Sequence, residues 1–222
     1  MELAKSFLIS ICTIFLFSCA NISYHIGSVG SITAEPTFDP NKTYTYYDDA
    51  VSKELKFEDF EVLVIPYNSV RTDSHFELFF IPVERQGSYM GSVGETLFQI
   101  SVSVKGELNK INFFPFKSDL NDDVKVQMVK WRDPKPTCDY EYIDWDILKL
   151  DSFHLVKDRL RNQNEKCMKS GWVEYLLVFD SETPDPKMKF TLELTFQDID
   201  SNKFIKKKLF FNAAKFVSTQ TH

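Results

Sequence analysis

The stretch that decides the fold runs from residue 187 to residue 197 and reads Lys-Met-Lys-Phe-Thr-Leu-Glu-Leu-Thr-Phe-Gln. Apolar and polar side chains alternate strictly over these 11 residues. Successive side chains of a β-strand point to opposite faces, so the pattern predicts a strand with one face buried and the other in water. Residues 98–105 show the same alternation, which predicts a second strand of this kind.

Further segments extend the β pattern along the chain. Residues 172–179 are nearly all apolar, which predicts a central strand buried on both faces. In residues 124–131 the apolar positions change face midway, which indicates a β-bulge. Weaker strand patterns, separated by polar turns, lie at residues 61–66, 76–83, 108–116 and 204–211.

We therefore expect an all-β fold, namely an Ig-like antiparallel β-sandwich of about eight strands, with a β-barrel as the alternative. The sandwich domain is expected to cover residues 51–217. One short helical excursion is expected at residues 151–165, because apolar residues recur there at helical spacing after Ser152, a good N-cap residue.

The N-terminus has the pattern of an export signal. An apolar run of 11 residues from Phe7 to Phe17 follows a short polar start with one lysine. A membrane-spanning helix needs about 20 apolar residues. The run is therefore too short to span a bilayer and is typical of the core of a signal peptide. It ends in the sequence Leu16-Phe17-Ser18-Cys19.

Leu16, Ser18 and Cys19 resemble the lipobox of bacterial lipoproteins. The resemblance implies that residues 1–18 are a signal peptide and that cleavage before Cys19 leaves this residue as an acylated N-terminus. The bilayer is then a partner through Cys19, and two or more acyl chains anchor a protein stably. Ala20 resembles an outer-membrane sorting signal of the same family. The alternative is an ordinary signal peptide that is cut near Ala20 and releases a soluble, secreted protein.

Residues 19–50 contain the sequence Gly-Ser-Val-Gly-Ser at positions 27–31 and two prolines further on. Flexible linkers are rich in glycine and serine. We therefore expect residues 19–50 to form the lipidated N-terminus and a tether that holds the domain away from the membrane.

The cysteines agree with an exported chain. Cys12 lies in the leader and Cys19 in the lipobox, which leaves Cys138 and Cys167 as a pair in an oxidising compartment. This pair predicts a disulfide that closes a loop of about 30 residues and stabilises the fold by about 3.5 kcal/mol. A zinc site or a redox pair is the alternative, but neither cysteine has a second cysteine two residues away and the nearest histidine is His154.

Segments that begin like metal-binding motifs lack the residues that these motifs require. The segment from Asp119 to Asp123 begins like a calcium loop, but Val124 and Lys130 stand where glycine and glutamate are required. An acidic hairpin turn is the better interpretation of this segment and of residues 198–202. The sequence holds no catalytic, metal or cofactor motif, and the net charge of −6 argues against a nucleic-acid partner.

The most unusual stretch is residues 139–146, in which four carboxylates alternate with aromatic side chains. Tyr140, Tyr142 and Trp145 suggest an interaction surface, because tyrosine and tryptophan dominate contact hot spots. A hard-cation site and a solvated loop are the alternatives. Taken together, the sequence predicts a non-catalytic, outer-membrane lipoprotein whose β-sandwich binds other envelope or host proteins. A periplasmic carrier of an apolar ligand and a secreted binding protein are the alternative functions.

Overall fold

The computed structural model describes residues 19–46, 48–51, 54–78, 81–106, 110–132, 144–150, 154–155 and 172–221. These residues form 15 strands that hydrogen-bond into one sheet, and one short 3-10 helix, η1 (Pro115–Lys117). The strands are β1 (Cys19–Ser31), β2 (Thr43–Thr45), β3 (Leu55–Lys56), β4 (Phe60–Pro66), β5 (Val70–Leu78), β6 (Ile81–Gln86), β7 (Thr96–Gly106), β8 (Ile111–Phe113), β9 (Asp119–Leu120), β10 (Val124–Arg132), β11 (Asp146–Ile147), β12 (His154–Leu155), β13 (Val173–Glu182), β14 (Phe190–Asp198) and β15 (Phe204–Thr221).

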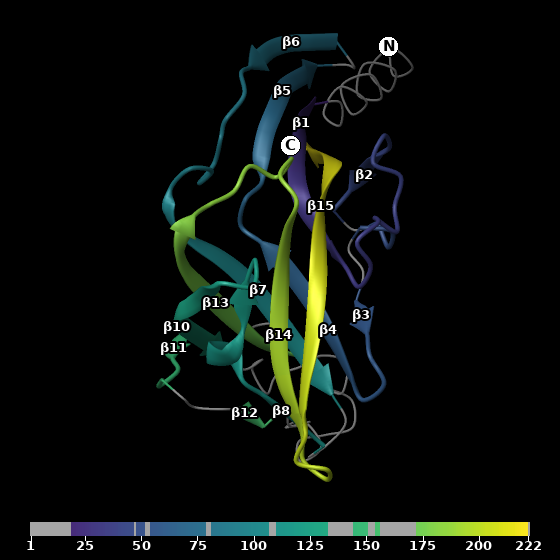
Figure 1. Cartoon of the computed structure of the whole chain (residues 1–222). Helices are drawn as coiled ribbons and strands as arrows, with labels where there is room; N and C mark the ends of the chain where they lie inside the picture. Colours follow the sequence, from purple (N-terminus) through teal and green to yellow (C-terminus); the bar gives the residue numbers. More distant parts are fainter. Residues whose placement is uncertain are drawn as a thin grey trace, which may run out of the picture.

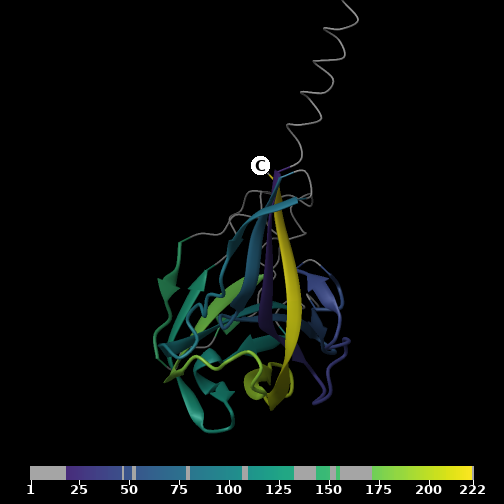
Figure 2. The same ribbon diagram turned by 90° about the horizontal axis from the view of Figure 1, so that it is seen from above.

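The all-β prediction is confirmed. Eleven strands follow one path in the order β3-β4-β7-β13-β10-β9-β14-β15-β1-β5-β6, and this antiparallel sheet curls into a half-barrel (Figures 1 and 2). The exception to antiparallel pairing is the short β2, which runs parallel to β15. The curl brings β4 against β14, because the rings of Phe60 and Phe196 lie 4.2 Å apart between their centroids.

The alternating stretch around residue 190 forms β14, as predicted. Its inward side chains, Phe190, Leu192, Leu194 and Phe196, are all buried. The alternating stretch in β7 behaves in the same way and supplies Phe98, Ile100, Val102 and Val104 to the interior. The two strands face one another across the core, where the rings of Phe98 and Phe190 pack edge to face at 5.6 Å.

Two finer predictions about strands are also confirmed. Strand β13 lies between β7 and β10, and its residues from Val173 to Phe179 are all buried. The register of β10 against β13 shifts between Val126 and Met128, which is the irregularity predicted from the change of apolar face. The acidic stretches at residues 121–123 and 199–203 connect β9 to β10 and β14 to β15, as expected for hairpin turns.

The prediction of a tether is wrong for residues 19–31. These residues form β1, which lies between β15 and β5 in the sheet. The glycines of β1 make room for aromatic rings of β15, since a Cβ on Gly27 would come within 3.3 Å of the Phe216 ring and one on Gly30 within 3.1 Å of the Phe211 ring. Small residues are therefore required here for packing rather than for flexibility.

The segment after β1 also packs on the sheet instead of extending away from it. Phe38, Tyr44 and Val51 are buried in a second apolar cluster together with Val29, Ala214 and Phe216. The rings of Phe38 and Tyr44 meet edge to face at 6.0 Å.

Two local predictions differ from the structure. Residues 76–83 were predicted as one strand, but β5 and β6 form a hairpin there, with Leu78 paired to Ile81. The helical excursion is wrong at residues 154–155, which form β12 and pair with β8. The other residues of the predicted helix lie outside the described residues.

Candidate functional site

Strand β1 begins at Cys19, the residue predicted to carry lipid. Cys19 is paired with Leu78 of β5, and the next residue, Ala20, is paired with Thr221 of β15. Cys19 therefore lies at the end of the sheet where β5 meets β6, which is uppermost in Figure 1.

The remaining predicted site residues are only partly described. Cys138 and Cys167 lie outside the described residues, as do Tyr140 and Tyr142, so their disulfide and surface roles stay predictions. Trp145 is described and half-buried. The centre of the Arg132 guanidinium lies 4.3 Å from the centroid of its ring, which is the geometry of a cation–π contact.

Besides its contact with Trp145, Arg132 belongs to a cluster of polar groups on the outer face of the sheet. Its Nε donates a hydrogen bond to Oε2 of Glu174 at 2.7 Å. Oε1 of the same carboxylate accepts a hydrogen bond from the Ser101 hydroxyl, also at 2.7 Å. Glu174 is only 8% exposed, so its charge is balanced by a cation and hydrogen bonds rather than by water.

The strand register explains why these groups meet. Glu174 precedes Tyr175, which points into the core and is fully buried, so Glu174 points to the opposite, outer face of β13. Arg132 is the residue of β10 that is paired with Glu174, while Ser101 lies on the neighbouring strand β7.

Tyr67 completes this group, which we call the outer-face cluster: Tyr67, Ser101, Arg132, Trp145 and Glu174. Tyr67 follows β4 and is 44% exposed. Burial, followed by the negative charge of Glu174, raises the pKa of the Tyr67 phenol, while a hydrogen bond with Ser101 and the charge of Arg132 act in the opposite direction. The cluster thus combines a fixed ion pair with two aromatic side chains that solvent reaches.

Sequence reasoning missed most of this cluster. The nearly all-apolar composition of residues 172–179 predicted burial on both faces, and the role of Glu174 was therefore not recognised. The available signal was a single carboxylate inside an apolar run, since a buried charge is retained only with a partner.

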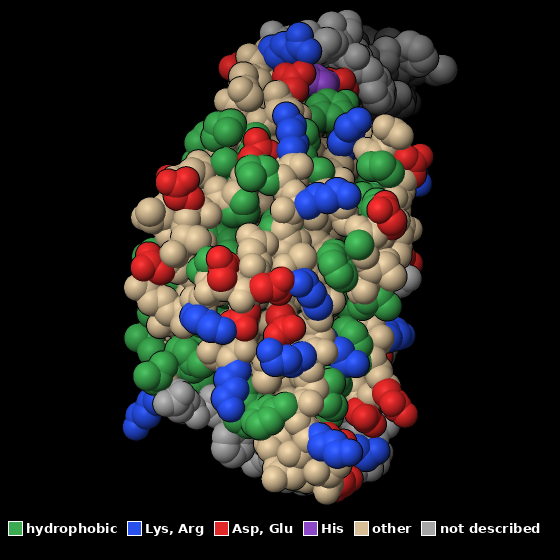
Figure 3. All heavy atoms as spheres, viewed as in Figure 1, with side chains coloured by type: hydrophobic (Ala, Val, Ile, Leu, Met, Phe, Trp, Pro, Cys, Tyr) green, Lys and Arg blue, Asp and Glu red, His purple; other side chains and the backbone are tan. Residues whose placement is uncertain are grey.

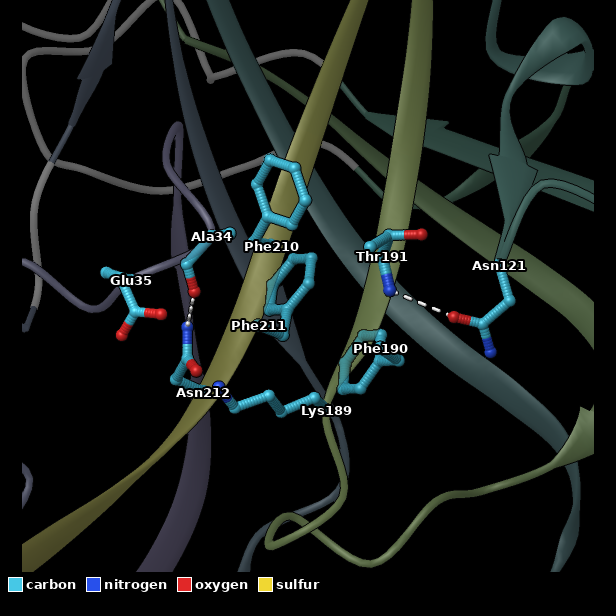
Figure 4. A pocket seen from close by; sticks show the side chains of 9 residues that line it. All are labelled: Ala34, Glu35, Asn121, Lys189, Phe190, Thr191, Phe210, Phe211 and Asn212. Carbon is cyan, nitrogen blue, oxygen red and sulfur yellow. Dashed lines mark hydrogen bonds between the residues drawn. The ribbon is translucent and has the colours of Figure 1, made fainter.

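A second candidate is a hollow of about 210 Å³ between the segment after β1 and strands β14 and β15 (Figure 4). Its apolar wall includes Phe190 and Phe211, whose rings stack at 4.5 Å. Its amides are engaged within the protein: Asn212 donates to the carbonyl of Ala34 at 3.4 Å, and Asn121 accepts from the backbone N–H of Thr191 at 2.9 Å. This hollow is therefore a weaker candidate than the outer-face cluster.

The face in Figure 3 carries acidic and basic side chains side by side. Among the described residues, three lysines have carboxylate partners: Lys206 with Glu193, Lys208 with Asp122 and Lys125 with Asp119. Residues 206–208 of β15 are paired with β14, whereas the pairing of β15 with β1 begins at Phe210, so the lysine run lies on a part of the strand that is paired on one side. Within the run, Lys206 and Lys208 form ion pairs with Glu193 and Asp122, and Lys207 lies over the Phe57 ring.

Comparison with protein-family models, curated proteins and solved structures gave no match. Within the described part of the chain, no helix has the length and apolar character needed to cross a membrane. The same residues contain no group of three or more His, Cys, Asp or Glu side chains placed to hold a metal ion.

Proposed function

We propose that this chain is a membrane-anchored envelope lipoprotein with a non-catalytic β domain that binds other envelope or host proteins. The position of Cys19 is the observation that carries the proposal. Because the described part of β1 begins at Cys19, cleavage between Ser18 and Cys19 would leave every residue pair that the structure describes in place. A lipid-modified Cys19 and a complete β domain are therefore compatible in one mature chain.

The outer-face cluster supports protein binding as the role of the domain. Tryptophan, tyrosine and arginine are the residues most enriched in binding hot spots. Here Arg132 is held by Glu174, so the guanidinium and the Trp145 ring over it have a fixed geometry before any partner arrives. Groups that are already ordered lose less entropy on binding.

The interior favours protein binding over the carriage of an apolar ligand. Phe113 and Phe196 are fully buried, and their rings lie 5.0 Å apart between centroids. Tyr175 is also fully buried and packs on Phe113 at 4.9 Å. Aromatic side chains of the protein thus occupy the space between the two halves of the sheet.

The Ig-like sandwich is part of the same proposal. Its support is the face-to-face packing of β4 and β7 against β14, which is how the two sheets of a sandwich enclose a core. A sandwich has two separate sheets, whereas here one continuous strand path runs through β9 and β10.

Intact mass spectrometry of membrane-extracted protein, with and without reductant, tests the anchor. We expect the loss of residues 1–18, the mass of about three acyl chains, as the lipoprotein resemblance implies, and a gain of two protons on reduction for a Cys138–Cys167 disulfide. An unmodified chain cut near Ala20 would refute this proposal and favour the alternative of a secreted binding protein.

Site-specific photo-crosslinking in the native cells tests the binding face. A photoreactive residue replaces Gln99, which is exposed on β7 next to Tyr67, and in a matched control it replaces the exposed Lys203 in the turn before β15. We expect a defined protein adduct at position 99 that disappears in the double variant Tyr67→Ala/Trp145→Ala. Equal adducts at both positions, or an adduct that survives the double variant, would contradict the assignment of this face.

A further inference from the structure

Another hollow lies next to the outer-face cluster and shares Tyr67 with it. Its volume is about 170 Å³, which is smaller than the pockets of about 300–1,000 Å³ that enclose drug-sized ligands. We call it the Tyr67 hollow, and its lining includes Tyr67, Glu95, Thr96, Leu97, Gln99 and Thr183. A volume of this size suits one inserted side chain rather than a whole small molecule.

A bulge between β7 and β13 shapes the hollow. The register of the two strands shifts between Phe179 and Glu182. Glu182 is paired with Thr96, so Leu97 stands opposite two residues of β13. The φ angle of Leu97 is +70°, in the left-handed region that a leucine rarely adopts. Bulges re-aim side chains, and Leu97 is 42% exposed, so it gives the hollow an aliphatic wall that solvent reaches.

The polar lining of the hollow carries negative charge. Glu95 is exposed and is the charged member of the lining, and no cation among the described residues forms an ion pair with it. Glu182, which is exposed and paired with Thr96, adds a second carboxylate beside the hollow. Arg132 of the outer-face cluster is balanced by Glu174. The negative charge at the hollow is therefore available to a partner.

Thr183 gives the hollow a polar group that lacks a partner. Its residue is only 4% exposed, and its backbone is fixed because its N–H donates to the Glu95 carbonyl at 2.8 Å and its own carbonyl accepts from Gly94 at 2.9 Å. Its side-chain hydroxyl forms no hydrogen bond with any residue in the described part of the chain. Polar groups in buried positions are normally hydrogen-bonded, so a donor on an inserted side chain would complete this site.

We propose that the Tyr67 hollow receives a basic side chain, arginine in preference to lysine, from the protein that the outer-face cluster binds. The inference rests on the proposed function and names the chemistry of that partner. Basic side chains have an apolar stem and a charged head, which match Leu97 and Glu95 in the lining. A guanidinium also stacks on the face of a tyrosine ring, and the Tyr67 ring is accessible. Its several N–H donors suit the acceptor groups of Glu95, Gln99 and Thr183.

Titration with a capped arginine tests the inference. N-acetylarginine methylamide is added to the isotope-labelled, processed chain in a neutral detergent, and the amide chemical shifts are followed by NMR. The matched probe is N-acetylcitrulline methylamide, which has nearly the same shape but no charge. We expect the arginine probe to shift the amides of Leu97 and Thr183 and the citrulline probe to bind about tenfold more weakly. Equal binding of the two probes, or shifts that avoid the hollow, would overturn the inference.

Substitutions locate the arginine probe in the hollow. Glu95→Gln keeps the size of the side chain and removes its charge, so it should weaken binding about fivefold. Tyr67→Leu removes the aromatic face and should weaken binding about threefold. Asp200→Asn makes the same change as Glu95→Gln in the exposed turn before β15 and should leave the affinity unchanged. The amide spectrum of each variant reports whether the fold is intact, and an affinity that is insensitive to Glu95→Gln would contradict the inference.

Photo-crosslinking in the native cells separates this inference from the proposed function. Because Gln99 lines the hollow, peptide mapping of the adduct at position 99 identifies the partner segment that lies there. We expect an arginine or lysine within a few residues of the crosslinked position, and a lower yield of the adduct when Glu95→Gln is added. A defined adduct whose partner segment has no basic residue would refute the basic side chain alone, whereas the absence of any adduct would end both proposals.

Discussion

The curl of the sheet can be measured through Phe60 and Phe196. Their strands, β4 and β14, are five steps apart along the strand path. Neighbouring strands are about 4.8 Å apart, so in a flat sheet these two strands would be separated by about 24 Å. In the curled sheet the ring centroids are 4.2 Å apart. A direct energetic coupling between the two side chains therefore requires the curl.

The size of the coupling follows from the contact. Phe196 is fully buried and Phe60 is 4% exposed, so each replacement by leucine acts on a packed core. Each single substitution should lower the free energy of unfolding by about 1 to 2 kcal/mol. Aromatic pairs contribute about 0.5 to 1.5 kcal/mol beyond the area that they bury. The double variant should thus lose about 1 kcal/mol less than the sum of the single losses.

Urea unfolding of residues 19–222 with Cys19→Ser, followed by fluorescence and circular dichroism, gives the four free energies of the cycle. A control cycle combines Phe60→Leu with Phe216→Leu, because Phe216 belongs to the second apolar cluster. The control should be additive within about 0.5 kcal/mol. Additivity of the Phe60 and Phe196 substitutions within the same margin, at unchanged m values, would refute the packing of β4 on β14.

Three further outcomes are expected from single sites. Burial raises the pKa of Tyr67. The contribution of Tyr67 to stability should therefore be complete below the unfolded pKa of about 10 and be lost as pH rises from there through the folded pKa. Urea midpoints measured up to about pH 11 should fall less in the Tyr67→Phe variant than in the unsubstituted protein. Burial lowers the pKa of His25, so its contribution should be complete above about pH 6.5 and be lost as pH falls through the folded pKa, which NMR titration of the ring can follow. Gly91→Ala should lower the free energy of unfolding in urea by about 2 kcal/mol, because φ at Gly91 is +62° and the new Cβ would lie 2.7 Å from a carbonyl oxygen. In the control Gly87→Ala the new Cβ meets no atom within 4 Å, so this variant should be nearly neutral.

The strands that sequence reasoning located well are those whose burial is set by alternation within the strand itself. In β14 each apolar residue from Phe190 to Phe196 faces the core, and period-two patterns report this directly. Strand β13 was located for a related reason, because a strand with neighbours on both sides and little exposed surface is nearly all apolar from Val173 to Phe179, with Glu174 as the exception.

Strand β1 shows what local patterns omit. Its glycines and serines are typical of a linker when the strand is considered alone. Their role depends on Phe211 and Phe216, which are 181 and 189 residues away in the chain and whose rings lie over Gly30 and Gly27 in the sheet. A sequence rule that considers only neighbouring residues cannot detect a contact between residues so far apart in the chain. The tether was therefore predicted at positions where the packing of β1 against β15 requires small side chains.

The outer-face cluster was missed for the same reason. Ser101, Arg132 and Glu174 come from three strands, and their meeting depends on the register of β7, β13 and β10. Trp145 was found because its own segment is unusual in composition. The sequence thus indicated one aromatic member of the cluster, while the charged pair that fixes it required the pairing of the strands.

Because Cys19 is itself part of β1, no described residue would separate a lipid on Cys19 from the sheet. A tethered domain moves freely above the bilayer, but the proposed attachment point belongs to a strand with 12 paired positions on β15 and eight on β5. Cleavage after Ala20 would remove only two of the β5 pairs and one β15 pair. The fold therefore tolerates either mature N-terminus, and the mass of the chain, rather than its stability, distinguishes the lipoprotein from the secreted alternative.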